Sequence, residues 1–220
     1  MVVVTNKSLK DMKIGITGTR AQCFASVLDE NKIKYHVIDI SEIDETFDLV
    51  FESGLYKIIT SALLKKPKFG IIGIHESPLP EGKGHAPIQW AVLNNRKNLA
   101  VTLYRLDAGI DSGKIIHCVN MPILKSDTLA ELNKKRLEGI ERVFSVFLKE
   151  LSEGFIVLRE QTGKGSYHKK RDKNSCQLNS ESKLIDLWDQ IRICDNDLYP
   201  AWFKVGKRKI ILKYEVIDEE

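Results

Sequence analysis

A short apolar run at residues 69–74 constrains the fold of this chain more than any other feature. Its sequence, FGIIGI, suits a strand that is buried in a parallel sheet. The segment HESPLP follows at once, and its two prolines cannot continue a strand or a helix. His75 therefore lies at the carboxyl end of a buried strand, where open α/β sheets form their ligand crevice.

Strand-like and helix-like segments alternate along the N-terminal part of the chain. Strands are predicted at residues 2–5, 13–17, 35–40, 48–51 and 100–104. Helices are predicted at residues 20–31, 61–65 and 86–94. This alternation predicts an α/β fold, with a Rossmann-like, mostly parallel sheet and helices on both faces.

A long amphipathic helix is predicted at residues 128–151, beginning at a capping box formed by Thr128 and Glu131. Its apolar side chains recur at helical spacing, and we expect them to pack against the sheet. They are Leu129, Leu132, Ile140, Val143, Phe144, Phe147 and Leu151.

The composition changes after residue 159, and we expect two domains, at 1–159 and 160–220. Residues 160–183 are polar and favour a solvated linker, although Tyr167 and its basic neighbours would also suit a diphosphate. A helix at 184–193 and a β-hairpin at 202–214 follow. Apolar side chains on that hairpin would serve a homodimer interface or pack against the first domain.

The overall composition limits the classes of partner. A chain of 220 residues that is 43% hydrophobic can bury one core, and its net charge of +4 permits an anionic ligand without indicating nucleic acid. Four scattered cysteines lack metal-ligand spacing, so we expect reduced thiols and no metal. With no signal-peptide pattern and no apolar run of about 20 residues, we expect a cytoplasmic protein that does not span a membrane.

Two residues suggest proton-transfer chemistry. The loop at 106–113 contains glycines that allow tight turns, so Asp111 can point back toward the crevice beside His75. A histidine paired with a carboxylate suits proton transfer near neutral pH. The alternative is a hydrogen-bonded histidine at a strand end and a turn-forming aspartate.

The spacing His-x-Ser-x-Leu-Pro-x-x-x-Gly-x-x-Pro begins at His75, and Asp-x-Gly follows at residues 111–113. This pattern resembles the formyltransferases that use 10-formyltetrahydrofolate, which include the glycinamide ribonucleotide, methionyl-tRNA and sugar-nucleotide enzymes. The similarity begins near residue 47, and the sequence YPAWF at 199–203 resembles that family's C-terminal extension.

The resemblance implies a catalytic triad of asparagine, histidine and aspartate, of which His75 and Asp111 carry over. Gly73 stands at the position of the asparagine, whose amide would stabilise the oxyanion. Glu76 is the nearest polar residue that could take over this role, directly or through a water. Alternatively, the backbone N–H at Gly73 could stabilise the oxyanion. A third possibility is that nothing replaces the asparagine and the activity is lower.

The resemblance also implies the ligand-binding residues. The pterin of 10-formyltetrahydrofolate would be held by apolar walls and main-chain hydrogen bonds, while Ser77 and Gly73 would face the acceptor substrate. The expected cofactor-binding residues are Lys57, Ile58, Ile59, Leu106, Asp107, Ala108, Gly109 and Ile110.

The sequence is compatible with several substrates that could accept the formyl group. The core-plus-hairpin organisation is most similar to sugar-nucleotide N-formyltransferases of surface-glycan synthesis, including those of the pseudaminic acid pathway. This predicts a nucleotide-linked amino sugar as the partner rather than tRNA, because the methionyl-tRNA enzymes carry a further C-terminal domain. The glycinamide ribonucleotide type is disfavoured by residues 17–20, TGTR, which make a poor phosphate loop. A relative that binds folate or sugar without turnover is the alternative from another class.

Overall fold

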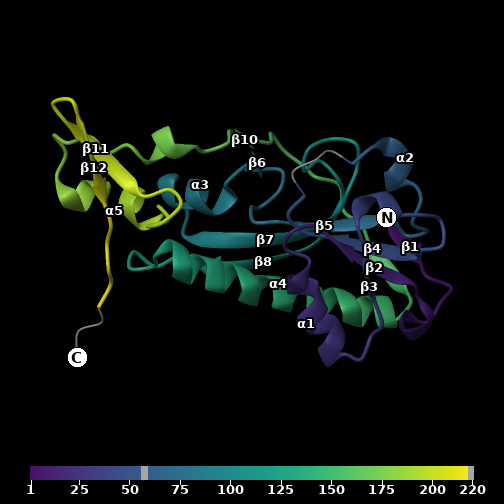
Figure 1. Ribbon diagram of the computed structural model, residues 1–220. Coiled ribbons are helices and arrows are strands. Elements are labelled where there is room, and N and C mark those ends of the chain that lie inside the picture. The colour runs from purple at the N-terminus through teal and green to yellow at the C-terminus, as the bar shows by residue number, and fades with distance from the viewer. Residues whose placement is uncertain (56–58, 218–220) are drawn as a thin grey trace.

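The computed structural model describes residues 1–55 and 59–217 of the chain. Six strands form the central sheet in the order β3-β2-β4-β5-β7-β8 (Figure 1). They are β2 (Ile14–Thr17), β3 (His36–Val37), β4 (Leu49–Glu52), β5 (Ile71–His75), β7 (Asn98–Arg105) and β8 (Ile115–Pro122). The first four strands in this order, from β3 to β5, are parallel, which confirms the predicted mostly parallel α/β fold.

The strand predicted at 100–104 runs antiparallel to β5, and β8, which was not predicted, runs antiparallel to β7. Arg105 therefore pairs with Ile72, near the start of β5, whereas His75 pairs with Thr102. The loop after β7 begins at the opposite end of β5 from His75 and must fold back over the sheet. Strand direction is not encoded in hydrophobic periodicity, so the sequence pattern could not reveal this.

The two faces of the sheet bury different side chains. Val50 and Ile71 pack with Leu63 of α2 (Ser61–Leu64), and α3 (Pro87–Leu93) lies on this side of the sheet (Figure 1). Phe51 packs on the other face against Phe144 of α4 (Leu129–Ser152), next to α1 (Gln22–Glu30). Helices therefore cover both faces, as predicted.

The capping box predicted for the long helix is present in α4. The Thr128 hydroxyl accepts from the backbone N–H of Glu131 at 3.4 Å, and the Glu131 carboxylate accepts from the N–H of Thr128 at 2.6 Å. The apolar stripe from Leu132 to Leu151 is buried against the sheet, while Leu129 is half-buried. The prediction of a helix packed along the sheet is confirmed.

Residues 160–171 cross the face of the sheet opposite α4 (Figure 1). Their strand β10 (Tyr167–His168) pairs in parallel with β6 (Lys83–Gly84). Trp90 is half-buried beneath them, stacks on His168 and donates to the carbonyl of Lys169 at 3.1 Å. Most of this stretch is exposed, as expected of a solvated linker, but it is also tied to the sheet domain by strand pairing and hydrogen bonds.

The C-terminal part has a small core of its own. It contains α5 (Leu184–Arg192) and the hairpin of β11 (Ala201–Val205) with β12 (Arg208–Leu212), as predicted. Trp202 is buried in this core, whereas Ile210 and Ile211 of the hairpin remain exposed. The homodimer and the division at residue 160 stay predictions.

The remaining elements are short. Strand β1 (Val2–Val4) pairs with β9 (Phe155–Val157) outside the central sheet. Three 3₁₀ turns are found at Leu9–Asp11, Ile40–Glu42 and Lys173–Cys176. Among residues 1–55 and 59–217, no helix combines the length and apolarity needed to cross a membrane.

Candidate active site

Three neighbouring strands place Glu52, Gly73 and Tyr104 in one row across the sheet. Glu52 of β4 pairs with Gly73 of β5, and Gly73 pairs with Tyr104 of β7. His75 lies two residues beyond Gly73 on β5, so its side chain projects from the same face. This face carries α2, α3 and the crossing segment 160–171.

His75 is buried between two hydrogen-bond acceptors. Its Nε2 is 2.8 Å from the carbonyl oxygen of Gly82, and its Nδ1 is 3.7 Å from the Oδ2 atom of Asp111. The protonated ring has one N–H for each of these acceptors. The structure therefore brings His75 and Asp111 together, in an arrangement that suits an imidazole that takes up and releases a proton.

Asp111 is held by groups from three parts of the chain. Its Oδ2 accepts from the backbone N–H of Gly84 at 2.8 Å, and its Oδ1 accepts from the Tyr104 hydroxyl at 2.9 Å. Burial raises the pKa of Tyr104 well above its ordinary value, so this hydroxyl stays a donor. The Gln161 amide donates to the carbonyls of Asp111 and Gly113, both at 2.8 Å.

Glu76 does not join this group. It directly follows His75, so its side chain projects from the opposite face of the sheet. There its carboxylate lies 3.2 Å from Arg20 and 3.7 Å from Arg136 of α4. The expectation that Glu76 takes the place of the missing asparagine is therefore not supported by the geometry.

The space beside Gly73 is filled by other side chains. A Cβ atom on Gly73 would lie 2.5 Å from Cδ1 of Leu106 and 3.3 Å from Oε2 of Glu52. Glu52 is buried, and its Oε1 accepts from the backbone N–H of Leu55 at 2.7 Å. Burial raises the pKa of Glu52 to about 7. The sequence interpretation missed Glu52, although a glutamate that ends the apolar run LVFE was a visible signal.

Ser77 lies against the loop that carries Gly82, since a Cβ atom on Gly82 would be 3.0 Å from the Cβ atom of Ser77. It is buried, and its carbonyl accepts from the Thr102 hydroxyl at 2.6 Å. Its own hydroxyl has no hydrogen-bond partner among the described residues. The hydroxyl is itself buried, and the expected contact between Ser77 and a substrate stays a prediction.

The residues expected to hold a cofactor lie beside this group. Ile59 and Leu106 pack in one apolar cluster, and the loop from Asp107 to Ile110 is exposed. Asp107 shapes that loop, because its Oδ1 accepts from the N–H of Gly109 at 3.0 Å. A cavity of about 350 Å³ is lined by Leu106, Asp107 and Ala108 together with α2. Lys57 and Ile58 lie outside the described residues.

An apolar wall beside an exposed loop backbone suits a flat heterocycle that needs both stacking and hydrogen bonds. The cavity volume is within the range of small-molecule sites, about 300–1,000 Å³. These observations fit a pterin-sized ring.

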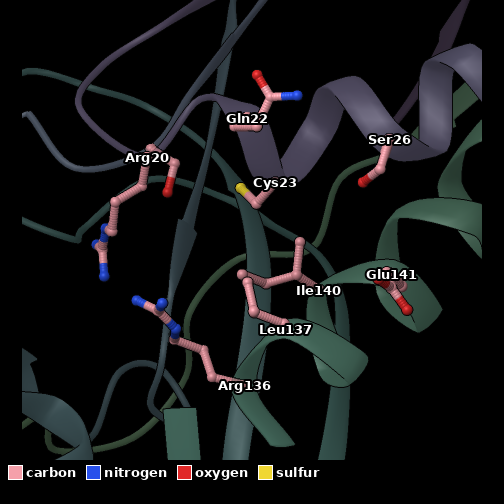
Figure 2. Close-up of a pocket in the computed structure, with 9 residues that line it drawn as sticks. Arg20, Gln22, Cys23, Ser26, Arg136, Leu137, Ile140 and Glu141 are labelled. Carbon is pink, nitrogen blue, oxygen red and sulfur yellow. The ribbon is translucent and has the colours of Figure 1, made fainter. Parts of the chain in front are cut away.

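A second cavity of about 390 Å³ lies between α1 and α4, on the face that carries Glu76. Figure 2 shows the guanidinium groups of Arg20 and Arg136 turned toward one another at its edge. Burial raises the pKa of Cys23 in this cavity to about 11, so its thiol stays protonated and is a poor nucleophile. Within the described part of the chain, no group of histidine, cysteine and acidic side chains has the geometry of a metal site.

Part of the chain matches a known protein family. A family model described as formyl transferase covers residues 29–146, just over half of the chain. A methionyl-tRNA formyltransferase from Thermodesulfovibrio yellowstonii is 30% identical over 196 residues, which are 86% of this chain and 60% of the relative. The chain spans about half the length of the curated relatives that it matches.

Solved structures share the fold. A methionyl-tRNA formyltransferase from Clostridium thermocellum has a TM-score of 0.76 at 19% identity and covers 94% of both chains. A sugar N-formyltransferase from Shewanella has a TM-score of 0.76 at 18% identity, over 94% of this chain and 99% of that one. HypX from Aquifex aeolicus in complex with tetrahydrofolic acid has a TM-score of 0.75 at 17% identity, over 91% of this chain and 37% of that one.

Proposed function

We propose that this chain, which belongs to the formyl transferase family, transfers the formyl group of 10-formyltetrahydrofolate to the amino group of a nucleotide-linked amino sugar. The observation that carries the proposal is the buried His75, held between the Gly82 carbonyl and the Asp111 carboxylate. Acyl transfer to an amine requires a group that removes a proton from the attacking nitrogen and returns one to the leaving nitrogen.

The proposed cofactor supplies an activated formyl group bound to nitrogen. Ile59 and Leu106 would provide the apolar wall for its ring, and the exposed loop at 107–110 would provide main-chain hydrogen bonds. The cavity beside Leu106 supports this assignment.

His75 would move the proton. The Gly82 carbonyl accepts only from a protonated Nε2, so the lone pair of the neutral ring is on Nδ1, the nitrogen nearest Asp111. A proton taken up at Nδ1 is stabilised by the Asp111 carboxylate. Tyr104 and Gly84 keep that carboxylate in place.

The crossing segment supports a nucleotide-linked acceptor. Pairing of β10 with β6 places this basic segment next to the loop that contacts His75. Its cationic side chains are Lys164, Lys169, Lys170 and Arg171, and Lys173 follows directly after it. A diphosphate between nucleoside and sugar would find several positive charges there. The solved sugar N-formyltransferase with the same fold is compatible with this substrate class.

Methionyl-tRNA is the second candidate acceptor, because the curated relatives are methionyl-tRNA formyltransferases. The charge of this chain favours the sugar, since 34 basic residues are nearly balanced by 30 acidic ones. A protein that holds tRNA by many phosphate contacts usually shows a stronger positive excess.

A transfer assay separates these acceptors. The protein is incubated with 10-formyltetrahydrofolate and either nucleotide-linked 4-amino sugars or methionyl-tRNA, and the products are examined by mass spectrometry. We expect a mass gain of one formyl group on a sugar, and a gain at least about 100-fold slower with His75→Ala. Formylation of methionyl-tRNA alone would establish the second candidate. No formylation of any amine would overturn the proposed activity.

A further inference from the structure

The formyltransferases have an asparagine where this chain has Gly73. In the row that contains Gly73, one polar side chain could take over the task of that asparagine. Glu52 and Tyr104 flank Gly73 on the two neighbouring strands. The Tyr104 hydroxyl donates to Asp111 and is therefore engaged. Oε2 of Glu52 lies 3.3 Å from the position that a Cβ atom on Gly73 would occupy. Glu52 is thus the nearest side chain in the row that can act beside Gly73.

The two oxygens of Glu52 have different surroundings. Oε1 accepts from the N–H of Leu55 at 2.7 Å, which leaves Oε2 as the atom that faces the row. The charged groups that act on this carboxyl are Arg20 before α1, Asp111 after β7 and Glu76 after β5, and two of them are acidic. The uncharged Tyr104 hydroxyl of β7 also lies nearby.

Burial raises the pKa of Glu52 to about 7, with a smaller contribution from the carboxylates of Asp111 and Glu76, because the lowering by the Leu55 hydrogen bond and by Arg20 is weaker than the effect of burial. Near neutral pH a large share of Glu52 therefore carries a proton. A protonated carboxyl group can donate a hydrogen bond, which an ionised one cannot. Ketosteroid isomerase uses a protonated aspartate in this way.

We infer that Glu52, in its protonated form, donates a hydrogen bond to the formyl oxygen during transfer and so performs the task of the missing asparagine at Gly73. This inference rests on the proposed function and names a further catalytic residue for it.

Glu52 keeps its proton throughout the reaction. The bond between the acceptor nitrogen and the formyl carbon forms, and the bond between that carbon and the folate nitrogen breaks. His75 accepts the proton that the acceptor nitrogen loses and returns it to the departing nitrogen. Glu52 only stabilises the negative charge that develops on the formyl oxygen.

The test compares two substitutions of Glu52. Glu52→Gln keeps a neutral donor at every pH, whereas Glu52→Leu removes the donor. We expect kcat of the leucine variant to fall by about 100-fold or more. The wild-type rate should decline as pH rises through about 7, and the glutamine variant should lose this alkaline decline.

A second readout does not depend on turnover. The stable analogue 10-formyl-5,8-dideazafolate is bound to each protein, and its formyl carbonyl stretch is measured by infrared spectroscopy. A hydrogen bond from Glu52 lowers that frequency in the wild type at pH 6 and in Glu52→Gln. The frequency should return toward its free value in Glu52→Leu.

Glu150→Gln is the matched control, because Glu150 is a partly buried carboxylate that pairs with His117 on the distant strand β8. It should leave both readouts unchanged. If the wild type and Glu52→Leu show the same carbonyl frequency and the same kcat, the inference is wrong while the proposed function stands. If the wild type neither binds the analogue nor transfers a formyl group, the proposed function fails and the inference fails with it.

Discussion

Asp111 is in the left-handed backbone region, with φ of +48°, which residues other than glycine, asparagine and aspartate rarely adopt. Tyr104, Gly84 and Gln161 together hold it there. A carboxylate fixed in this way needs little reorganisation when the charge on His75 changes, which is the physical basis of preorganised catalysis.

Substitution of either member of this pair should impair transfer. His75→Ala removes the group that moves the proton, and Asp111→Asn removes the charge that stabilises the protonated ring. Each should lower kcat by at least about 100-fold, measured as formyl transfer at saturating substrate. His36→Ala, at an exposed position on β3, is the control and should keep wild-type kcat. A folded His75→Ala protein with most of the wild-type rate would contradict this role.

Glu52 should also make stability depend on pH. Its pKa is raised from 4.5 to about 7 in the folded protein, so its contribution is fully present below pH 4.5 and is lost as pH rises through about 7. Between pH 5 and 8.5 the wild type should lose about 2–3 kcal/mol relative to Glu52→Gln. Urea unfolding of both proteins at the two pH values measures this difference. If the free energy of unfolding changes equally with pH in the wild type and in Glu52→Gln, ionisation of Glu52 does not destabilise the folded protein.

The sequence alone predicted that His75 and Asp111 lie together, because both are part of a motif with fixed spacing. The sequence alone did not predict that Glu52 and Tyr104 lie beside Gly73, because this placement depends on strand register. Only the pairing of β4, β5 and β7 places them beside Gly73. The sequence led to a wrong expectation for Glu76. Because Glu76 directly follows His75, its side chain projects from the opposite face of the sheet.

At the scale of elements, the crossing segment 160–171 completes the site. Ser166 accepts from the N–H of Gly82 at 2.8 Å, and Gln161 binds two carbonyls of the loop after β7. Composition alone suggested a linker, because the segment buries few apolar side chains. Its order comes from polar contacts with loops that the sequence does not place next to it.

Removal of one such contact should loosen the site. Gln161→Ala leaves the carbonyls of Asp111 and Gly113 without their donor, and we expect a loss of about 1–2 kcal/mol of stability. Hydrogen exchange of residues 106–113 should become faster. Gln22→Ala, at an exposed position of α1, is the control. Unchanged exchange in Gln161→Ala would mean that other contacts fix the loop.

At the scale of the whole molecule, a buried arginine joins the C-terminal core to the sheet domain. Arg192 of α5 donates to the carbonyls of Leu124 at 3.1 Å and Asp127 at 2.5 Å, and to the Asp189 carboxylate at 2.7 Å. Its side chain is only 2% exposed. The two parts are therefore connected by directed polar bonds as well as by packing.

Arg192→Met should break this connection. The substitution keeps the length of the side chain but leaves the buried carbonyl of Asp127 and the part-buried carbonyl of Leu124 unpaired, so we expect a loss of about 3 kcal/mol in the free energy of unfolding. Arg208→Met, on the exposed hairpin, should change stability by less than about 0.5 kcal/mol. Urea unfolding measures both. Equal stability of the two variants would show that apolar packing alone joins the parts.

The pairing of β1 with β9 has a consequence for synthesis on the ribosome. Val2 pairs with Val157, so β1 finds its partner only after β9 has left the exit tunnel. Until then its apolar residues lack the neighbour that orders them, while the strands of the central sheet can already associate. Strand β1 is therefore translated before its partner β9 and can dock only after the strands of the central sheet have been made.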